Sequence, residues 1–162
     1  MRYFYLVLVL FLLSAKTKSD YVKPSLKSKF FVLQSAKKVK WQSGAPEGKG
    51  GAGVDYELTL KFTKNYDGYF KMLWIGNKYF AIKYKNEATI KDYNHFKKDQ
   101  VITIYASEVV RSGVGIYKQE DKNVTDPPFK YDGVALLEYE YHAKTYSMIV
   151  KSWSEEKKVD GI

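Results

Sequence analysis

The chain of 162 residues is long enough for one domain, and its lack of cysteine excludes disulfides, thiolate nucleophiles and cysteine-based zinc sites. Its formal net charge of +9 comes from 25 lysines and only two arginines, Arg2 and Arg111. Because arginine supplies the planar fork that reads bases and phosphates, this composition argues against nucleic-acid binding. The lysine excess leaves weak adhesion to anionic surfaces open.

Residues 1–19 have the pattern of a secretory signal peptide. A basic start is followed by the apolar run 4–13 and then by small and polar residues. The run is shorter than the roughly 20 apolar residues of a membrane-spanning helix. Cleavage is expected before Asp20, whereas cleavage after Ala15, an uncleaved anchor and a short buried helix are alternatives. We therefore expect a β-rich domain at 20–162, exported to the periplasm or beyond, with no membrane span in the mature chain.

The first half of this domain alternates between apolar and polar residues. Residues 29–42 are predicted to form one long strand, interrupted by a bulge at Lys37-Lys38. Residues 54–62 alternate most regularly, and successive side chains of a strand point to opposite faces. The apolar face of this segment consists of Val54, Tyr56, Leu58, Leu60 and Phe62.

Two hairpins and further strands are predicted after residue 62. Residues 69–75 and 78–84 flank Gly76-Asn77, a turn that favours positive φ, and residues 134–141 and 144–153 flank His142-Ala143. Segments 88–93 and 100–106 are predicted to be further strands. Segments 43–53 and 107–133 are expected to be loops, and 154–162 is expected to be a charged tail. About seven to nine strands at this spacing predict an antiparallel β-sandwich. A small lipocalin-like barrel is the alternative.

The glycine cluster at residues 48–53 matches the letters of the dinucleotide-binding motif G-x-G-x-x-G. That motif works only between a strand and a helix whose N-terminus receives the pyrophosphate. Here an alternating strand follows the glycines. We therefore interpret the segment as a flexible connection and expect no cofactor.

Two pairs of carboxylates are the only candidates for acid–base chemistry. Glu138 and Glu140 share one face of a predicted strand, as do Asp55 and Glu57. Alternating charge is typical of a strand face in water, so a hydrolase that uses Glu138 or Asp55 is only an alternative. The two histidines, His95 and His142, lack metal-ligand spacing. We predict no catalytic site and no metal site.

Four short motifs resemble small exported proteins of unknown function from Gram-negative environmental bacteria. They lie within residues 39–84 and read Trp41-Gln42-Ser43-Gly44, the glycines up to Gly53, Tyr56-Glu57-Leu58 and Leu73-Trp74-Ile75-Gly76. The resemblance implies export and no particular activity.

The expected function is a non-catalytic, exported binding or interaction module of the bacterial envelope. Trp41, Tyr56 and Trp74, near the glycine-rich segment, are the candidate contacts for an unidentified protein or glycan partner, because aromatic residues are enriched in binding surfaces. A barrel that carries a small apolar ligand is the first alternative, and the carboxylate-dependent hydrolase is the second.

Overall fold

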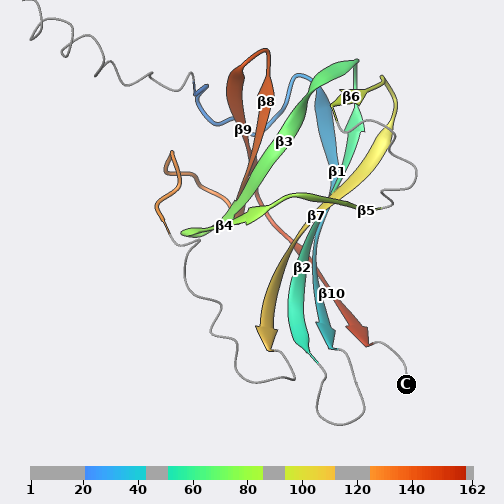
Figure 1. Cartoon of the computed structure of the whole chain (residues 1–162), viewed down its shortest axis with the longest axis vertical. Helices are drawn as coiled ribbons and strands as arrows, with labels where there is room; N and C mark the ends of the chain where they lie inside the picture. Colours follow the sequence, from blue (N-terminus) through green and yellow to red (C-terminus); the bar gives the residue numbers. More distant parts are fainter. Residues whose placement is uncertain (1–20, 43–50, 86–93, 112–124, 160–162) are drawn as a thin grey trace, which may run out of the picture.

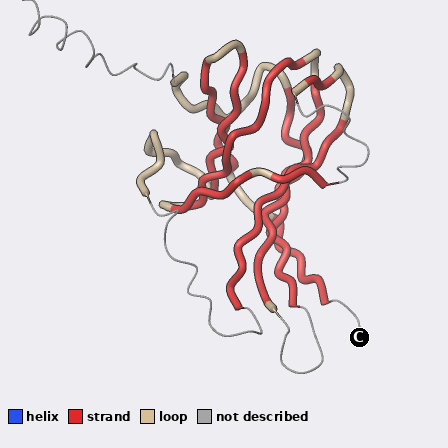
Figure 2. The backbone as a smooth tube through the Cα atoms, in the orientation of Figure 1, coloured by secondary structure: helices blue, strands red, loops and turns tan. Residues whose placement is uncertain are grey.

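The computed structural model describes residues 21–42, 51–85, 94–111 and 125–159. Two five-stranded β-sheets pack together, and no helix occurs within these ranges. The predicted β-sandwich is therefore confirmed, and the described strands do not close into the alternative barrel (Figures 1 and 2). The leader predicted at 1–19 and the strand predicted at 88–93 lie outside the described residues.

The first sheet is built on the long strands β1, β2 and β7. Its strand order is β10-β1-β2-β7-β5, and all neighbours are antiparallel except β10, which runs parallel to β1. Its strands span β1 Phe31–Gln42, β2 Ala52–Phe62, β5 Lys83–Lys85, β7 Val101–Arg111 and β10 Ser154–Val159.

The second sheet contains both predicted hairpins. Its strand order is β4-β3-β8-β9, with the short β6 paired to the start of β3. Gly76 in the β3–β4 turn has a φ of 61°, and His142 and Ala143 in the β8–β9 turn have φ values of 50° and 58°. Its strands span β3 Tyr66–Ile75, β4 Lys78–Ala81, β6 His95–Phe96, β8 Ala135–Tyr141 and β9 Lys144–Val150.

The core between the sheets is rich in aromatic rings. The apolar face predicted for residues 54–62 points into it, with Leu58, Leu60 and Phe62 fully buried. The ring of Phe62 stacks on that of Phe96 at 4.7 Å between centroids, and Tyr66 donates a hydrogen bond to the carbonyl of Glu140 at 2.7 Å. Aromatic pairs of this kind contribute about 0.5–1.5 kcal/mol each beyond burial, so the core holds the fold without disulfides.

Several predicted boundaries are wrong, among them the following three. The irregularity in β1 falls between Leu33 and Ser35 and not at Lys37-Lys38. The strand expected at 78–84 breaks at Ile82, where the chain leaves β4 and joins the other sheet as β5. The loop expected from residue 107 begins later, because β7 continues to Arg111.

The segment expected to be a charged tail is also wrong, because it forms β10. Its residues pair with β1 from Lys37 to Gln42, and Glu156 accepts a hydrogen bond from the ammonium group of Lys37 at 2.6 Å. The residues at its start, Ser154, Glu155 and Glu156, are exposed and mostly charged, so the segment lacks the alternating pattern that marks a half-buried strand.

Candidate functional site

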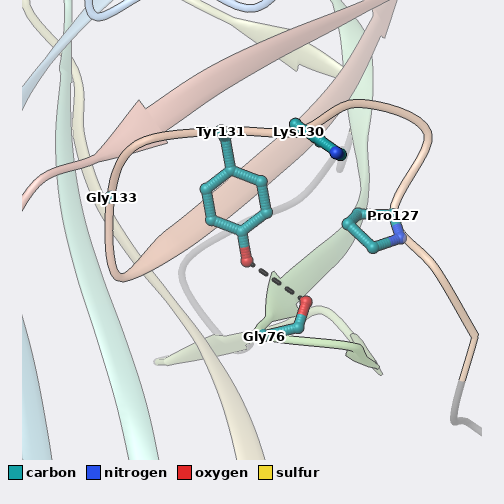
Figure 3. Close-up of a pocket in the computed structure, with 5 residues that line it drawn as sticks. All are labelled: Gly76, Pro127, Lys130, Tyr131 and Gly133. Carbon is teal, nitrogen blue, oxygen red and sulfur yellow. Dashed lines mark hydrogen bonds between the residues drawn. The ribbon is translucent and has the colours of Figure 1, made fainter.

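A hollow of about 390 Å³ lies where residues 125–133 pass over the β3–β4 turn. Small-molecule sites typically have volumes of about 300–1,000 Å³. The tyrosine ring points toward the glycine turn, whereas the lysine side chain points away from the tyrosine, on the side where the proline ring lies (Figure 3). The lining residues are Gly76, Pro127, Lys130, Tyr131 and Gly133.

The floor of the hollow is the turn at Gly76. Its φ of 61° is a conformation that glycine adopts without the steric cost of a side chain, and no atom lies within 4 Å of where a Cβ would be. The turn therefore leaves open space and an accessible backbone beneath the hollow. The hydroxyl of Tyr131 donates to the carbonyl of Gly76 at 3.4 Å and lies 3.5 Å from that of Trp74 (Figure 3).

Contacts at both ends fix the segment that forms the wall. At the beginning, the amide of Thr125 donates to the carbonyl of Asn77 at 2.9 Å. At the other end, the ammonium group of Lys151 lies 2.7 Å from both the carbonyl and the carboxylate of Asp132. A Cβ on Gly133 would lie 2.5 Å from the carbonyl oxygen of Val150, so glycine is required for this close approach. The wall is thus held in place before any ligand arrives.

A row of buried polar groups lies on the same sheet, on the face opposite the core. Glu138 is 1% exposed and pairs across the strands with Ser147 on β9 and Met72 on β3, whereas Trp74 pairs with the neighbouring Leu136. In the described residues, the indole nitrogen of Trp74, Oε1 of Glu138 and the hydroxyl of Ser147 are buried without a hydrogen-bond partner. Such groups are rare in native proteins because each costs about 1–3 kcal/mol.

The burial of Glu138 shifts the pKa of its carboxyl group. Removal from water raises the pKa of its carboxyl group, and the nearby indole of Trp74 and the ammonium group of Lys71 lower it less. The prediction that Glu138 lies on a solvated strand face is therefore wrong. Glu140, two residues further on, accepts a hydrogen bond from Tyr69 at 2.7 Å on the more exposed part of this face.

The three predicted contact residues do not form one surface. Trp41 is half-buried near the end of β1, where its ring covers Gly53. Tyr56 is 6% exposed in the core, and its hydroxyl donates to the carboxylate of Glu108 at 3.1 Å. Trp74 is also 6% exposed, but it lies in the other sheet, and its carbonyl faces the hydroxyl of Tyr131. Only Trp74 therefore adjoins the hollow.

The other carboxylates and the histidines that the sequence singled out do not line the hollow. Asp55 lies in β2 opposite Val39 and Ser107, and Glu57 accepts from Lys85 at 2.6 Å. His95 pairs with the carboxylate of Asp67 at 2.7 Å. Among the described residues, no group of three or more histidine, aspartate or glutamate side chains could hold a metal ion.

The sequence pointed to no residue that lines the hollow as a binding residue. Residues 125–133 contain proline, lysine and tyrosine without periodicity, and they were predicted only as part of a long loop. The one available signal was Gly76-Asn77, which predicted the turn that forms the floor. The wall depends on contacts with distant strands, which a local pattern cannot indicate.

No protein-family model matches the chain, and no curated protein and no solved structure is significantly similar to it. The resemblance of residues 39–84 to small exported proteins stays a prediction. Within the described ranges, the chain contains no helix that is long and apolar enough to cross a membrane.

Proposed function

We propose that the protein is an exported, non-catalytic binding module and that its ligand site is the hollow between the β3–β4 turn and residues 125–133. The observation that carries the proposal is the lining of the hollow, which combines two ring surfaces, one cation and exposed glycine backbone. Small-molecule sites typically combine apolar walls with a few fixed polar groups in this way.

The lining favours a ligand that has both a ring and a carboxylate, such as an acidic sugar. The rings of Pro127 and Tyr131 offer flat apolar surfaces for the C–H face of a sugar, and Lys130 offers a positive charge. The backbone of Gly76 can approach the ligand closely, because no side chain intervenes.

Binding is favoured over hydrolysis because the described residues that line the hollow include no carboxylate and no histidine. General acid–base catalysis requires such a group within hydrogen-bond reach of the reacting bond. Glu138 has a raised pKa, as a general acid needs, but it is 1% exposed and does not line the hollow.

Calorimetric titration with D-glucuronate tests the proposed ligand site, with D-glucose as the uncharged comparison. At about 0.3 kcal/mol for each of roughly 13 non-hydrogen atoms, we expect a Kd on the order of 1 mM for glucuronate. Lys130→Gln should weaken glucuronate binding about tenfold, because Lys130 is the one cation among the described lining residues. Lys83→Gln is the matched control, since Lys83 is an exposed lysine on β5. Equal binding by both variants would contradict the assignment.

Export is supported by the leader pattern and by the start of the described fold. Tyr21, which would be the second residue of the mature chain after cleavage before Asp20, pairs with Thr145 at the edge of β9. N-terminal sequencing of the protein from the envelope fraction and medium of an expressing bacterium tests this part. A first residue at Asp20 is expected, whereas an intact chain in the cytoplasm would contradict export.

A further inference from the structure

Five lysines gather at one end of the sandwich, which we call the basic end: Lys29, Lys64, Lys97, Lys98 and Lys144. The strand register requires this placement. β1 begins where β2 ends, with Phe31 opposite Phe62, and β7 begins beside Lys61. The β8–β9 turn comes to the same end, because the ring of Phe30 lies 4.3 Å from that of Tyr141. This is the upper end of the molecule in Figure 1.

The positive charge of the basic end is not neutralised within the described part of the chain. None of its five lysines forms an ion pair with another described residue, although two carboxylates lie at the same end. Asp99 lies 3.4 Å from the ammonium group of Lys61, and Asp67 pairs with His95.

Two of these cations share one aromatic ring. The ammonium groups of Lys29 and Lys64 each lie 5.2 Å from the centroid of Phe30. Each ammonium group is thus held by a cation–π contact with the ring, which leaves its positive charge able to attract an anion.

Exposed apolar side chains accompany the charge. Val101 is 51% exposed and Val32 is 48% exposed, although both lie in strands of a sheet with a well-filled core. They flank Lys61 on adjacent strands at the basic end, since Lys61 pairs with Val32 on one side and Val101 on the other. Tyr21 and Val22, also exposed, lie beside Thr145 near the same end.

The geometry points to the basic end as a docking surface for an anionic lipid bilayer, an interaction beyond the proposed ligand site. Lysines near a negatively charged bilayer are attracted to its headgroups, while exposed apolar side chains enter the interface. A nucleic acid explains the lysines but not the exposed valines, and the basic end contains no arginine to read bases. The remaining lysines of the two sheets are largely paired with carboxylates, as Lys37 is with Glu156 and Lys78 with Glu108.

Sedimentation with vesicles tests the docking surface. The full chain is mixed with vesicles of phosphatidylcholine alone or with vesicles that also contain phosphatidylglycerol. Apolar residues 4–13 can add affinity for both kinds of vesicle, so the difference between the two partition coefficients is compared. We expect binding to the anionic vesicles that weakens as salt is added. The double variant Lys64→Gln/Lys98→Gln should reduce the anionic partition coefficient about 30-fold, at about fivefold for each lysine near the surface.

The matched control is Lys38→Gln/Lys83→Gln, which removes the same charge from β1 and β5 away from the basic end. It should retain most of the binding. An equal loss in both double variants would mean that only net charge matters and would overturn the proposal. Binding that inorganic phosphate abolishes at matched ionic strength would also overturn it, because the site would then take free phosphate. Retention of the wild-type circular dichroism spectrum by both variants ensures that folding does not explain the result.

Discussion

The ring of Trp41 in β1 lies directly against Gly53 in β2, so that a Cβ on Gly53 would be 2.5 Å from the indole. The two residues are cross-strand partners. The same Cβ would be 2.6 Å from the carbonyl oxygen of Glu108 in β7. The glycine therefore permits three strands and one large ring to pack at a single point.

Gly53→Ala should consequently destabilise the fold by about 1–3 kcal/mol, the usual cost of overpacking against backbone that cannot move. Urea unfolding of the variant measures this loss. Gly76→Ala is the comparison, because its new Cβ would meet no atom within 4 Å and only its φ of 61° would cost about 1–2 kcal/mol. A shift in Trp41 fluorescence in the first variant alone is expected. Unchanged fluorescence and stability in Gly53→Ala would contradict this packing.

Glu138→Gln should make the protein progressively more stable than the wild type as the pH rises above about 4.5. The folded pKa of Glu138 is raised above its unfolded value, so its contribution is fully present at low pH and is lost as the pH rises through the folded pKa. Thermal unfolding of both proteins between pH 4 and pH 8 measures the difference. Asp132→Asn should show the opposite slope, but below about pH 4, because Lys151 lowers the pKa of Asp132 from its ordinary 3.8; unfolding scans extended to about pH 2 measure this effect. If the difference in stability between Glu138→Gln and the wild type did not change with pH, Glu138 would not be a buried carboxyl group with a raised pKa.

The core tyrosines should resist ionisation until the fold opens. Burial, reinforced by Glu108, raises the pKa of Tyr56 to about 12, and burial raises that of Tyr66 further. A buried tyrosine with a raised pKa destabilises nothing below pH 10, where it is neutral in both the folded and the unfolded chain. As the pH rises toward the pKa of the folded state, the unfolded chain ionises first and the fold becomes less stable. Ultraviolet titration should therefore show a late class of tyrosines that disappears in denaturant, where all titrate near pH 10. A single transition near pH 10 in the folded protein would refute this packing.

Truncation after Trp153 should destabilise the fold by about 1–3 kcal/mol and promote self-association, because it removes β10 and exposes the edge of β1. Size-exclusion chromatography and urea unfolding measure the two effects. Glu156→Gln is the control, since loss of its exposed ion pair with Lys37 should cost less than about 1 kcal/mol. If the truncated chain matched the wild type in both measurements, β10 would not be an integral strand.

The sequence predicted the elements whose signal is local. Residues 54–62 alternate because one face of β2 is buried and the other is partly wet, and Gly76-Asn77 predicts the β3–β4 turn because positive φ requires it. β10 was not predicted because its sequence is mostly charged and lacks alternating apolar residues, as an exposed tail does. The sequence around Ile82 does not indicate that the chain leaves one sheet and joins the other there.

The candidate site could not be predicted from the sequence for a different reason. Glu138 resembles a solvated residue between apolar neighbours, and its burial depends on packing against both adjacent strands and the segments that cover them. Tyr131 meets Gly76 only because residues 125–133 return over a turn some 55 positions earlier in the chain. Such contacts follow from the topology, which periodicity alone does not specify.

Amide mapping by nuclear magnetic resonance tests the ligand site most directly. A ¹H–¹⁵N spectrum of the protein is followed while D-glucuronate is added. The amide signals of Gly76, Lys130 and Gly133 should shift together in a saturable manner, and those of Lys64 and Lys98 at the far basic end should not. Shifts confined to the basic end, or no saturable shift around Tyr131, would contradict the hollow as the binding site.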